Sequence, residues 1–186
     1  KAGFSIDNTA TTCPPLVSTF ADKSTVQNTS IQSVEWLFGD GAVSKLTQPV
    51  KSYFYPGNYD ITYKVTDVDG CTDSVVLKNQ IKIGGPIGRY YKDADKGCVP
   101  FKVNFSSQSQ NAKTVSWDFG NGTLSNAPSA TAEYVITGTF VPTMVLEDAA
   151  GCKVAYPVDP IKGFASPKPS FSTKGNCLYD VFELKN

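Results

Sequence analysis

The chain contains an internal repeat, and this repeat constrains its fold more than any other feature of the sequence. Residues 34–41 (VEWLFGDG) return 81 positions later as residues 115–122 (VSWDFGNG). The same offset relates a cysteine, an aspartate and a glycine in the two copies: Cys71 and Cys152, Asp67 and Asp148, Gly57 and Gly138. An offset shared by turn, core and cysteine positions indicates one structural unit that is used twice.

A third copy begins near the end of the chain. Each copy opens with a cysteine that is followed seven positions later by an apolar residue: Cys13 and Phe20, Cys98 and Phe105, Cys177 and Leu184. We therefore expect a first domain over residues 1–84, a second over residues 85–163, and the first strands of a truncated third over residues 164–186. This organisation is typical of a segment of a longer array, and any targeting segment is expected to lie outside it.

The local pattern within each repeat predicts β-strands. Residues 59–66 alternate between apolar and polar side chains, as a half-buried strand does. In the second copy Pro142 interrupts the equivalent segment, and because proline donates no ladder hydrogen bond we expect an edge strand or a bulge there. Turns rich in Gly, Asn and Pro separate the short strands, which favours an all-β sandwich in each repeat. The expected linkers are residues 84–86 and the proline-rich residues 157–169.

The composition excludes several classes of function. The 17 acidic and 17 basic residues balance to a net charge of zero, and no basic cluster of the kind that binds nucleic acid is present. No run of apolar residues is long enough to predict direct insertion into a membrane. Histidine is absent, which removes the Ser-His-Asp and Cys-His arrangements, and we expect no enzymatic activity. Five widely spaced cysteines indicate a compartment where disulfides persist, and hence an extracellular or cell-surface location.

The order of the motifs resembles the PKD (polycystic kidney disease) domain. In the first copy the resemblance rests on residues 36–41 (WLFGDG), Tyr53, residues 57–59 (GNY) and residues 65–67 (VTD). The second copy keeps the corresponding positions: residues 117–122 (WDFGNG), Tyr134, Gly138 and Asp148. The resemblance implies tandem immunoglobulin-like β-sandwiches. Two positions depart from the family pattern, Leu37 and Asn121, and asparagine tolerates the same turn conformations as the usual aspartate.

The placement of the cysteines is similar to that in PKD arrays of large bacterial cell-surface proteins. Such arrays occur in Bacteroidetes, including gliding-motility adhesins that are exported by type IX secretion. The resemblance implies that neighbouring PKD modules of the same chain are the immediate partners. A surface glycan or protein is a further partner to consider, whereas nucleic acid is not expected.

Five cysteines permit many disulfide pairings, and the repeat favours pairing within each module. This gives the bridges Cys13–Cys71 and Cys98–Cys152, and it leaves Cys177 unpaired in the fragment. Each bridge would close a loop of about 60 residues and contribute roughly 4 kcal/mol through the entropy of the unfolded chain. The alternative is a set of reduced, buried thiols, which accounts less well for two copies with cysteines at the same places.

The remaining candidate residues have structural interpretations that compete with functional ones. Trp36 and Trp117 are expected in the cores rather than on a sugar-binding platform, because they are equivalent and no further tryptophan exists. The glycine-rich hairpins are expected to need positive φ, and they comprise Gly39, Asp40, Gly41, Gly120, Asn121 and Gly122. Asp67 and Asp148 are expected to fasten a turn through side-chain hydrogen bonds. Asp67 and Asp69 are also weak candidates for Ca²⁺, and we expect no other cofactor.

Three functions are compatible with this sequence. The favoured one is a non-catalytic extracellular stalk or spacer of a large repetitive adhesin, in which disulfide-locked modules project a distal binding region and limit extension under load. The alternatives are a glycan- or protein-binding module, and accessory domains of a secreted hydrolase such as a protease or chitinase. The start of a third copy favours the array, because such hydrolases typically carry few PKD copies.

Overall fold

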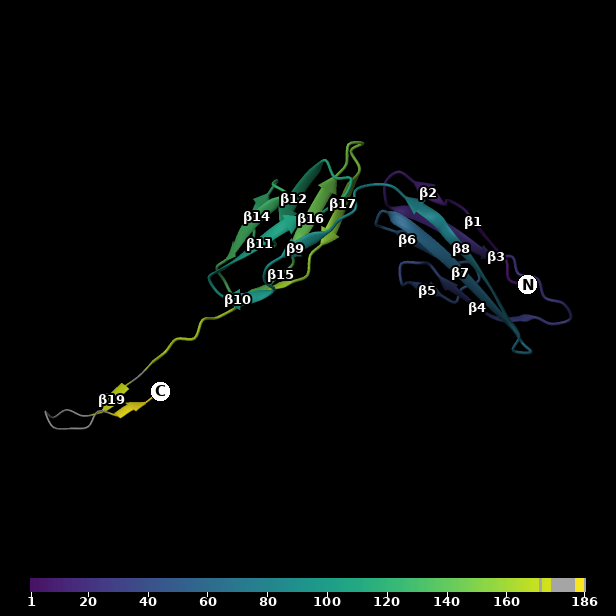
Figure 1. Cartoon of the computed structure of the whole chain (residues 1–186). Coiled ribbons are helices and arrows are strands. Elements are labelled where there is room, and N and C mark those ends of the chain that lie inside the picture. Colours follow the sequence, from purple (N-terminus) through teal and green to yellow (C-terminus); the bar gives the residue numbers. More distant parts are fainter. Residues whose placement is uncertain (171, 175–182, 186) are drawn as a thin grey trace.

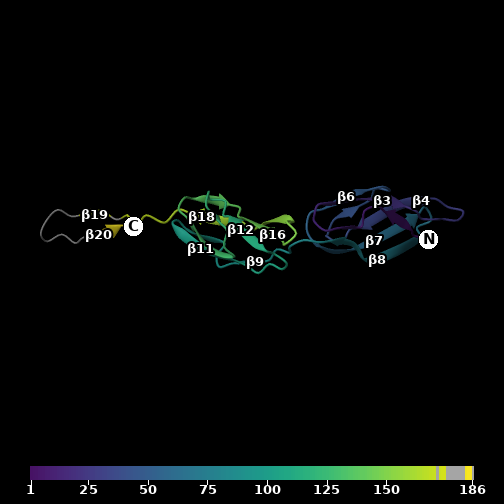
Figure 2. The same cartoon turned by 90° about the horizontal axis from the view of Figure 1, so that it is seen from above.

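The computed structural model describes residues 1–170, 172–174 and 183–185, and in this part of the chain every regular element is a β-strand. Two β-sandwich modules lie end to end, and a short extended segment leaves the second one (Figures 1 and 2). Part of the third copy that the sequence predicts over residues 164–186 falls outside these ranges, and Cys177 is among the residues that are not described. Within the described part, β19 (Ser172–Lys174) pairs antiparallel with β20 (Glu183–Lys185).

The first module is a sandwich of a three-stranded and a five-stranded sheet. The three-stranded sheet has the order β1-β3-β6, and the five-stranded sheet has the order β2-β8-β7-β4-β5. The strands are β1 (Phe4–Ile6), β2 (Ala10–Thr11), β3 (Leu16–Asp22), β4 (Ile31–Leu37), β5 (Val43–Ser44), β6 (Val50–Tyr53), β7 (Gly57–Asp67) and β8 (Thr72–Ile83). The predicted alternation is confirmed on β7, where Ile61, Tyr63 and Val65 are buried.

The second module repeats this arrangement with shorter strands. Its sheets have the orders β14-β11-β9, β13-β12-β16-β17 and β10-β18-β15. The strands are β9 (Tyr90–Lys92), β10 (Lys96–Cys98), β11 (Phe101–Ser107), β12 (Thr114–Asp118), β13 (Leu124–Ser125), β14 (Ser129–Tyr134), β15 (Gly138–Phe140), β16 (Thr143–Glu147), β17 (Lys153–Pro157) and β18 (Ile161–Phe164). The long hairpin of β7 and β8 is therefore divided into two shorter ladders.

Pro142 lies at the point of this division. It separates β15 from β16, and because it donates no ladder hydrogen bond the continuous strand of the first module cannot form. The prediction of an edge strand is wrong, since β16 pairs with β12 on one side and with β17 on the other. In the first module the ladder is irregular at the same place, where the register shifts between Tyr59 and Ile61.

The second predicted linker is too long. Residues 157–169 were expected to join modules, but Val158 and Ile161 are buried in the second core and β18 runs over Ile161–Phe164. The extended connection therefore begins only after Phe164. The proline-rich composition misled the prediction because these prolines flank a buried strand rather than a free segment.

Equivalent residues fill the two cores. Trp36 and Trp117 are 0% and 1% exposed, which places both in the cores and removes them as sugar-stacking residues. Each indole N–H donates to a backbone carbonyl ten residues further on, to that of Leu46 at 2.8 Å and to that of Ala127 at 3.1 Å. Phenylalanine rings lie beside both tryptophans, and Tyr63 also lies beside Trp36, at centroid distances of 4.2–6.5 Å. The polar atom of each indole is thus satisfied within an otherwise apolar core.

The glycine-rich hairpins adopt the predicted positive φ. Gly39 has φ 79° and Gly120 has φ 71°, a region that side chains with a Cβ rarely adopt. A Cβ on Gly39 would lie 2.6 Å from the carbonyl oxygen of Asp60, so backbone also passes too close for any other residue. Gly41 and Gly122 have positive φ as well, with no atoms within 4 Å of a Cβ.

Candidate functional site: the junction between the modules

The junction between the two modules is joined by a disulfide bond. Cys13 of the first module is bonded to Cys152 of the second, at a sequence separation of 139 and a Cα–Cα distance of 5.6 Å. The predicted pairings Cys13–Cys71 and Cys98–Cys152 are therefore wrong. Within the described residues Cys71 and Cys98 are free and exposed. Two of the four cysteines expected in disulfides are bonded, and they link modules instead of closing one.

The geometry of the sandwich excludes a bridge within one module. Cys71 follows the turn at the start of β8, whereas Cys13 lies beside the other end of β8, where Thr11 pairs with Ile83. The 12 residues of β8 span about 36 Å at ~3.3 Å per residue. A disulfide requires Cα atoms within about 7 Å of each other. The two repeat cysteines therefore sit at opposite ends of each module.

A hydrogen-bonded turn presents Cys152 to the junction. The Oδ1 atom of Asp148 accepts hydrogen bonds from the backbone N–H of Ala150 at 2.8 Å and of Cys152 at 2.9 Å. In the first module Oδ1 of Asp67 accepts from Asp69 and Cys71 at 3.0 and 2.9 Å. The predicted role of the two aspartates in fastening a turn is confirmed.

Aromatic contact adds to the junction beside the disulfide. The rings of Tyr55 from the first module and Tyr156 from the second stack with centroids 5.3 Å apart. The hydroxyl of Tyr156 donates to the carbonyl of Pro86 at 2.7 Å, and burial raises the pKa of Tyr156. Sequence reasoning missed this tyrosine. Its equivalent in the first module is Val75, so an aromatic residue that fails to recur was the signal.

The connecting segment lies close against both modules. A Cβ on Gly85 would lie 3.1 Å from Sγ of Cys152 and 3.1 Å from Cγ of Pro56, and Pro86 is buried. Gly84 N–H donates to Thr11 on one side, and Ile87 exchanges two backbone hydrogen bonds with Gln110 on the other. The predicted linker 84–86 is thus a fixed part of the junction rather than a free tether.

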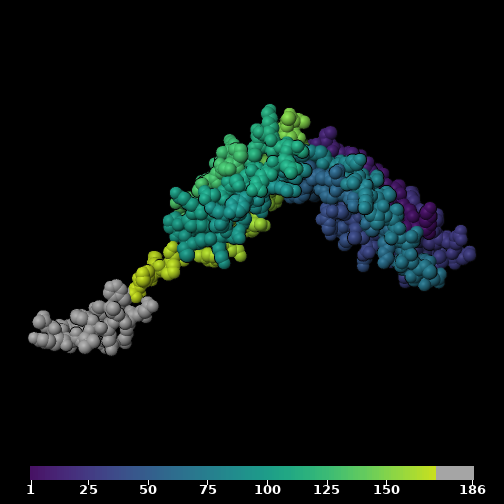
Figure 3. All heavy atoms as spheres, in the orientation of Figure 1, coloured from purple at the N-terminus to yellow at the C-terminus, as the bar shows by residue number. Residues whose placement is uncertain are grey.

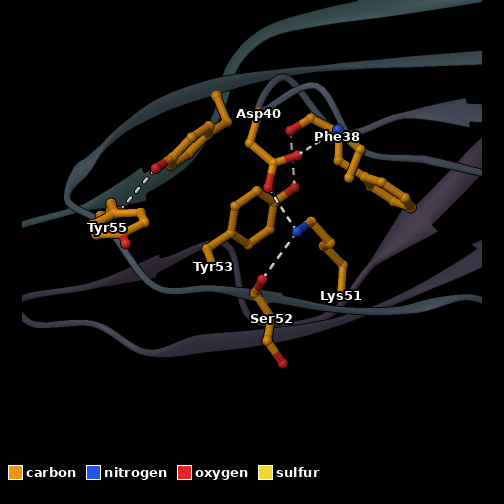
Figure 4. A network of polar contacts seen from close by, with 8 residues as sticks. Phe38, Asp40, Lys51, Ser52, Tyr53 and Tyr55 are labelled. Carbon is orange, nitrogen blue, oxygen red and sulfur yellow. Dashed lines mark hydrogen bonds and ion pairs between the residues drawn. The ribbon is translucent and has the colours of Figure 1, made fainter. Parts of the chain in front are cut away.

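A polar network supports the loop that reaches the junction from the first module (Figure 4). Lys51 Nζ lies 2.6 Å from Oδ2 of Asp40 and donates to the carbonyl of Ser52 at 3.1 Å. The Tyr53 hydroxyl donates to the carbonyl of Phe38 at 3.2 Å, and the hydroxyl of Tyr59 donates to the carbonyl of Tyr55 at 2.9 Å. These contacts tie residues 51–55 to the glycine-rich hairpin and hold the Tyr55 backbone in place.

The calcium hypothesis gains no support from this geometry. Oδ1 of Asp67 already accepts two backbone hydrogen bonds, and Asp69 lies exposed in the same turn. Over the described ranges, no group of three or more His, Cys, Asp or Glu side chains is placed to hold a metal ion. The same part of the chain holds no helix long and apolar enough to cross a membrane.

A shallow hollow lies on the surface of the second module. It has a volume of about 610 Å³ and lies between the glycine-rich hairpin and β14, with Phe119, Asn121, Leu124, Glu133 and Ile136 among its lining residues. Of the described side chains that line it, Glu133 is the one that carries a charge. A single carboxylate offers no pair for acid and base chemistry.

The comparisons with known proteins agree with this architecture. Two sequence models of the PKD domain match the chain, one over residues 4–83 and one over residues 98–155. The chain therefore belongs to the PKD domain family and contains two such domains, each an immunoglobulin-like β-sandwich. PKD domains are accessory modules without catalytic activity of their own.

Individual relatives match one module at a time. Over 52 residues, 28% of this chain, the sequence is 42% identical to a microbial collagenase of Vibrio alginolyticus, of which the match spans 6%. The PKD1 domain of the Vibrio cholerae metalloprotease PrtV is 29% identical, with a TM-score of 0.38, over 45% of this chain and 94% of that one. The PKD1 domain of Vibrio anguillarum Epp is 25% identical, with a TM-score of 0.39, over 45% of this chain and 93% of that domain.

Proposed function

We propose that this segment is a non-catalytic spacer of an extracellular protein, in which PKD modules are joined end to end and project a distal binding region. The array organisation of the repeat extends the proposal to a large repetitive cell-surface adhesin. The observation that supports it best is the covalent junction, because a disulfide between modules fixes their order and distance. Disulfides persist in oxidising compartments, which favours an extracellular location.

The junction is built as a mechanical connection. A bridge, a tyrosine stack and a hydrogen-bonded linker act on the same few residues, so the ends of the modules cannot separate independently. Figures 1 and 3 show the modules meeting end to end at an angle, which gives an elongated body. A spacer adds length to the protein that contains it, and an elongated body gives more length for the same number of residues.

The bridge also determines where tension runs. When the chain is pulled by its termini, force passes from Cys13 through the two sulfur atoms to Cys152. The polypeptide between these cysteines, a sequence separation of 139, bears no tension until the bond is reduced. At ~3.5 Å per residue, about 480 Å of contour length is withheld. Residues 1–12 and the chain after Cys152 remain extensible.

Single-molecule pulling tests this proposal. With the termini attached, the oxidised protein is expected to show a contour-length gain shorter by about 480 Å than the protein in reductant. The double variant Cys13→Ser/Cys152→Ser should extend fully with or without reductant, which separates the bridge from other effects of reduction. Equal extension of the native protein in both conditions would overturn the proposal.

A second candidate is an accessory role beside a hydrolase, which the similarity to a microbial collagenase favours. Under this function the modules would position a catalytic domain or its substrate, and the hollow on the second module is the place to look for binding. Glycan and collagen-peptide arrays probed with the 186-residue chain discriminate between the two. A pure spacer binds neither array, whereas saturable binding that Glu133→Ala or Leu124→Ala weakens would favour the accessory role.

A further inference from the structure

Cys71 and Cys98 are the two repeat cysteines without a bonded partner in the described structure, and both are exposed. Cys71 is equivalent to the bonded Cys152, and Cys98 is equivalent to the bonded Cys13. One cysteine of each kind is therefore bonded and the other is free. The difference lies in the neighbour, because Cys152 is covered by the first module and is 7% exposed.

The free cysteines sit in the same local structures as the bonded ones. Cys71 receives the same pair of carboxylate contacts in its turn that Cys152 receives, within 0.2 Å for each distance. Cys98 ends a short strand that runs parallel to β18, as β2, two residues before Cys13, runs parallel to β8. Each free thiol is thus presented in the arrangement that forms the observed junction.

The surfaces around the two free thiols also match a junction. Near the outgoing end of the second module Ile136 and Phe164 are 64% and 50% exposed, and Ile136 is equivalent to Tyr55, which makes the observed stack. Beside Cys71, Val68 is 54% exposed. One exposed pair of opposite charges is available as well, since Asp69 lies two residues before Cys71 and Lys96 lies two residues before Cys98 in β10.

We propose that Cys98 and Cys71 are the outgoing and incoming halves of a second junction of the same kind. Cys98 would bond to the turn cysteine of a following PKD module, and Cys71 to the opening cysteine of a preceding one. A second copy of this chain presents both surfaces and is the partner to which the proposal commits for its test. Such head-to-tail contacts use two different surfaces, so they propagate along a line rather than closing a pair. The inference rests on the spacer function and extends its covalent junction along the array.

The bond forms by two thiol–disulfide exchanges. The Cys98 thiolate attacks a low-molecular-weight disulfide, which releases one thiol and leaves a mixed disulfide on the protein. The thiolate of the partner's turn cysteine then attacks the Cys98 sulfur and releases the second thiol. Two protons leave the protein thiols, two electrons reduce the oxidant to two thiols, and one S–S bond joins the modules.

Directed cross-linking tests the inference. We use the 186-residue chain with Cys177→Ser, and we prepare two further variants that also carry Cys71→Ser or Cys98→Ser. Under a glutathione redox buffer, a mixture of these two variants can form the Cys98–Cys71 bridge, whereas each alone can form only a symmetric one. The mixture is expected to form disulfide dimers about tenfold faster than either alone, which corresponds to about 1.4 kcal/mol of docking.

Peptide mapping of the products completes the test. Dimers of the mixture should contain the Cys98–Cys71 peptide pair, and Lys96→Glu should slow their formation. Equal rates in all three samples, or no cross-link in the mixture, would overturn the inference. The Cys13–Cys152 pair is read in the same maps, so its absence would count against the spacer function, whereas its presence in samples without dimers would count against this inference alone.

Discussion

The two modules stabilise the same hairpin by different polar contacts. In the first, Asp40 is paired with Lys51, whose Nζ also donates to the carbonyl of Ser52. In the second, Asn121 replaces the aspartate and the buried Ala132 replaces the lysine. Nδ2 of Asn121 donates at 2.9 Å to the carbonyl of Glu133, which is the equivalent of Ser52.

This difference shows that the hairpin position (Asp40 or Asn121) and the position of its partner (Lys51 or Ala132) change together. The Oδ1 atom keeps its role in both modules, since it accepts from Ala42 N–H in the first and Thr123 N–H in the second, at 3.1 and 3.0 Å. If an aspartate stood at position 121, its second carboxylate oxygen would lie near the carbonyl of Glu133 without a lysine to pair with. An amide nitrogen at that place restores a donor, because Asn offers both a donor and an acceptor where Asp offers only acceptors.

The largest expected effect comes from emptying one core at a time. Trp36→Ala or Trp117→Ala should cost about 4 kcal/mol in the module that carries it, because each indole is buried and hydrogen-bonded. Hydrogen exchange followed by mass spectrometry reports each module separately. Leu46→Ala, at an exposed position whose carbonyl still accepts the Trp36 bond, is the matched control. Equal loss of protection in both modules would show a single cooperative unit instead of two.

The hairpin glycines should differ in their sensitivity. Gly39→Ala is expected to cost about 3 kcal/mol, since the new Cβ would lie 2.6 Å from backbone and φ is positive. Gly120→Ala should cost less, because its closest contacts are at 3.0 Å. Gly41→Ala, which shares the positive φ but has open space, isolates the conformational strain at about 1 kcal/mol. Denaturant midpoints in the opposite order would contradict the close approach.

Alkaline pH should destabilise the two modules to different extents, because of their buried tyrosines. Burial raises the pKa of Tyr63 and of Tyr134 to about 12, and the position of Tyr63 is occupied by Met144 in the second module. A tyrosine with a raised folded pKa contributes stability that is present below pH 10 and is lost as pH rises toward 12.

The first module, which also holds Tyr53 with a raised pKa, should therefore lose stability more steeply from pH 10 to pH 12. The additional slope is about 1.4 kcal/mol per pH unit for one further buried tyrosine. Urea unfolding at a series of pH values measures it, with module-specific exchange as the readout. Tyr63→Phe should make the pH dependence of stability alike in the two modules. If the difference between the modules is unchanged, a group other than Tyr63 causes it.

The smallest expected effect concerns the polar pair itself. Lys51→Ala should cost about 1 kcal/mol, because Asp40 then keeps a partly buried oxygen without its donor. Adding Asp40→Asn to that variant imports the arrangement of the second module and should restore most of the loss. A double-mutant cycle measures the coupling. Additive effects of the two changes would show that the positions are independent.

The repeated features were predictable because they are local. Strand alternation at residues 59–66, the glycine-rich hairpins and the aspartate turns depend on residues close in sequence, and all three appear in the structure. Both tryptophans were placed in the cores by their recurrence alone. The family of the chain followed from the same motifs, since their order is specific.

The disulfide could not be predicted in this way. Recurrence shows that Cys13 and Cys71 belong to one module, but pairing depends on distance, and β8 separates the two by its full length. The other residues of the junction could not be predicted from the sequence for a related reason. Tyr156 and Pro86 act between modules, so one copy of the repeat holds no pattern that marks them.

The separation of 139 residues between Cys13 and Cys152 also orders events during synthesis. Cys13 is made first, and Cys71 and Cys98 follow before its partner exists. In an unfolded chain the shorter loop to Cys71 is favoured by about 0.8 kcal/mol of closure entropy, so premature oxidation selects the wrong pair. Once β8 has formed, that pair is held apart. The Cys13–Cys152 bond can then form only after the Asp148 turn of the second module has folded. A molecule that contains this bond is therefore one in which both modules reached their native state.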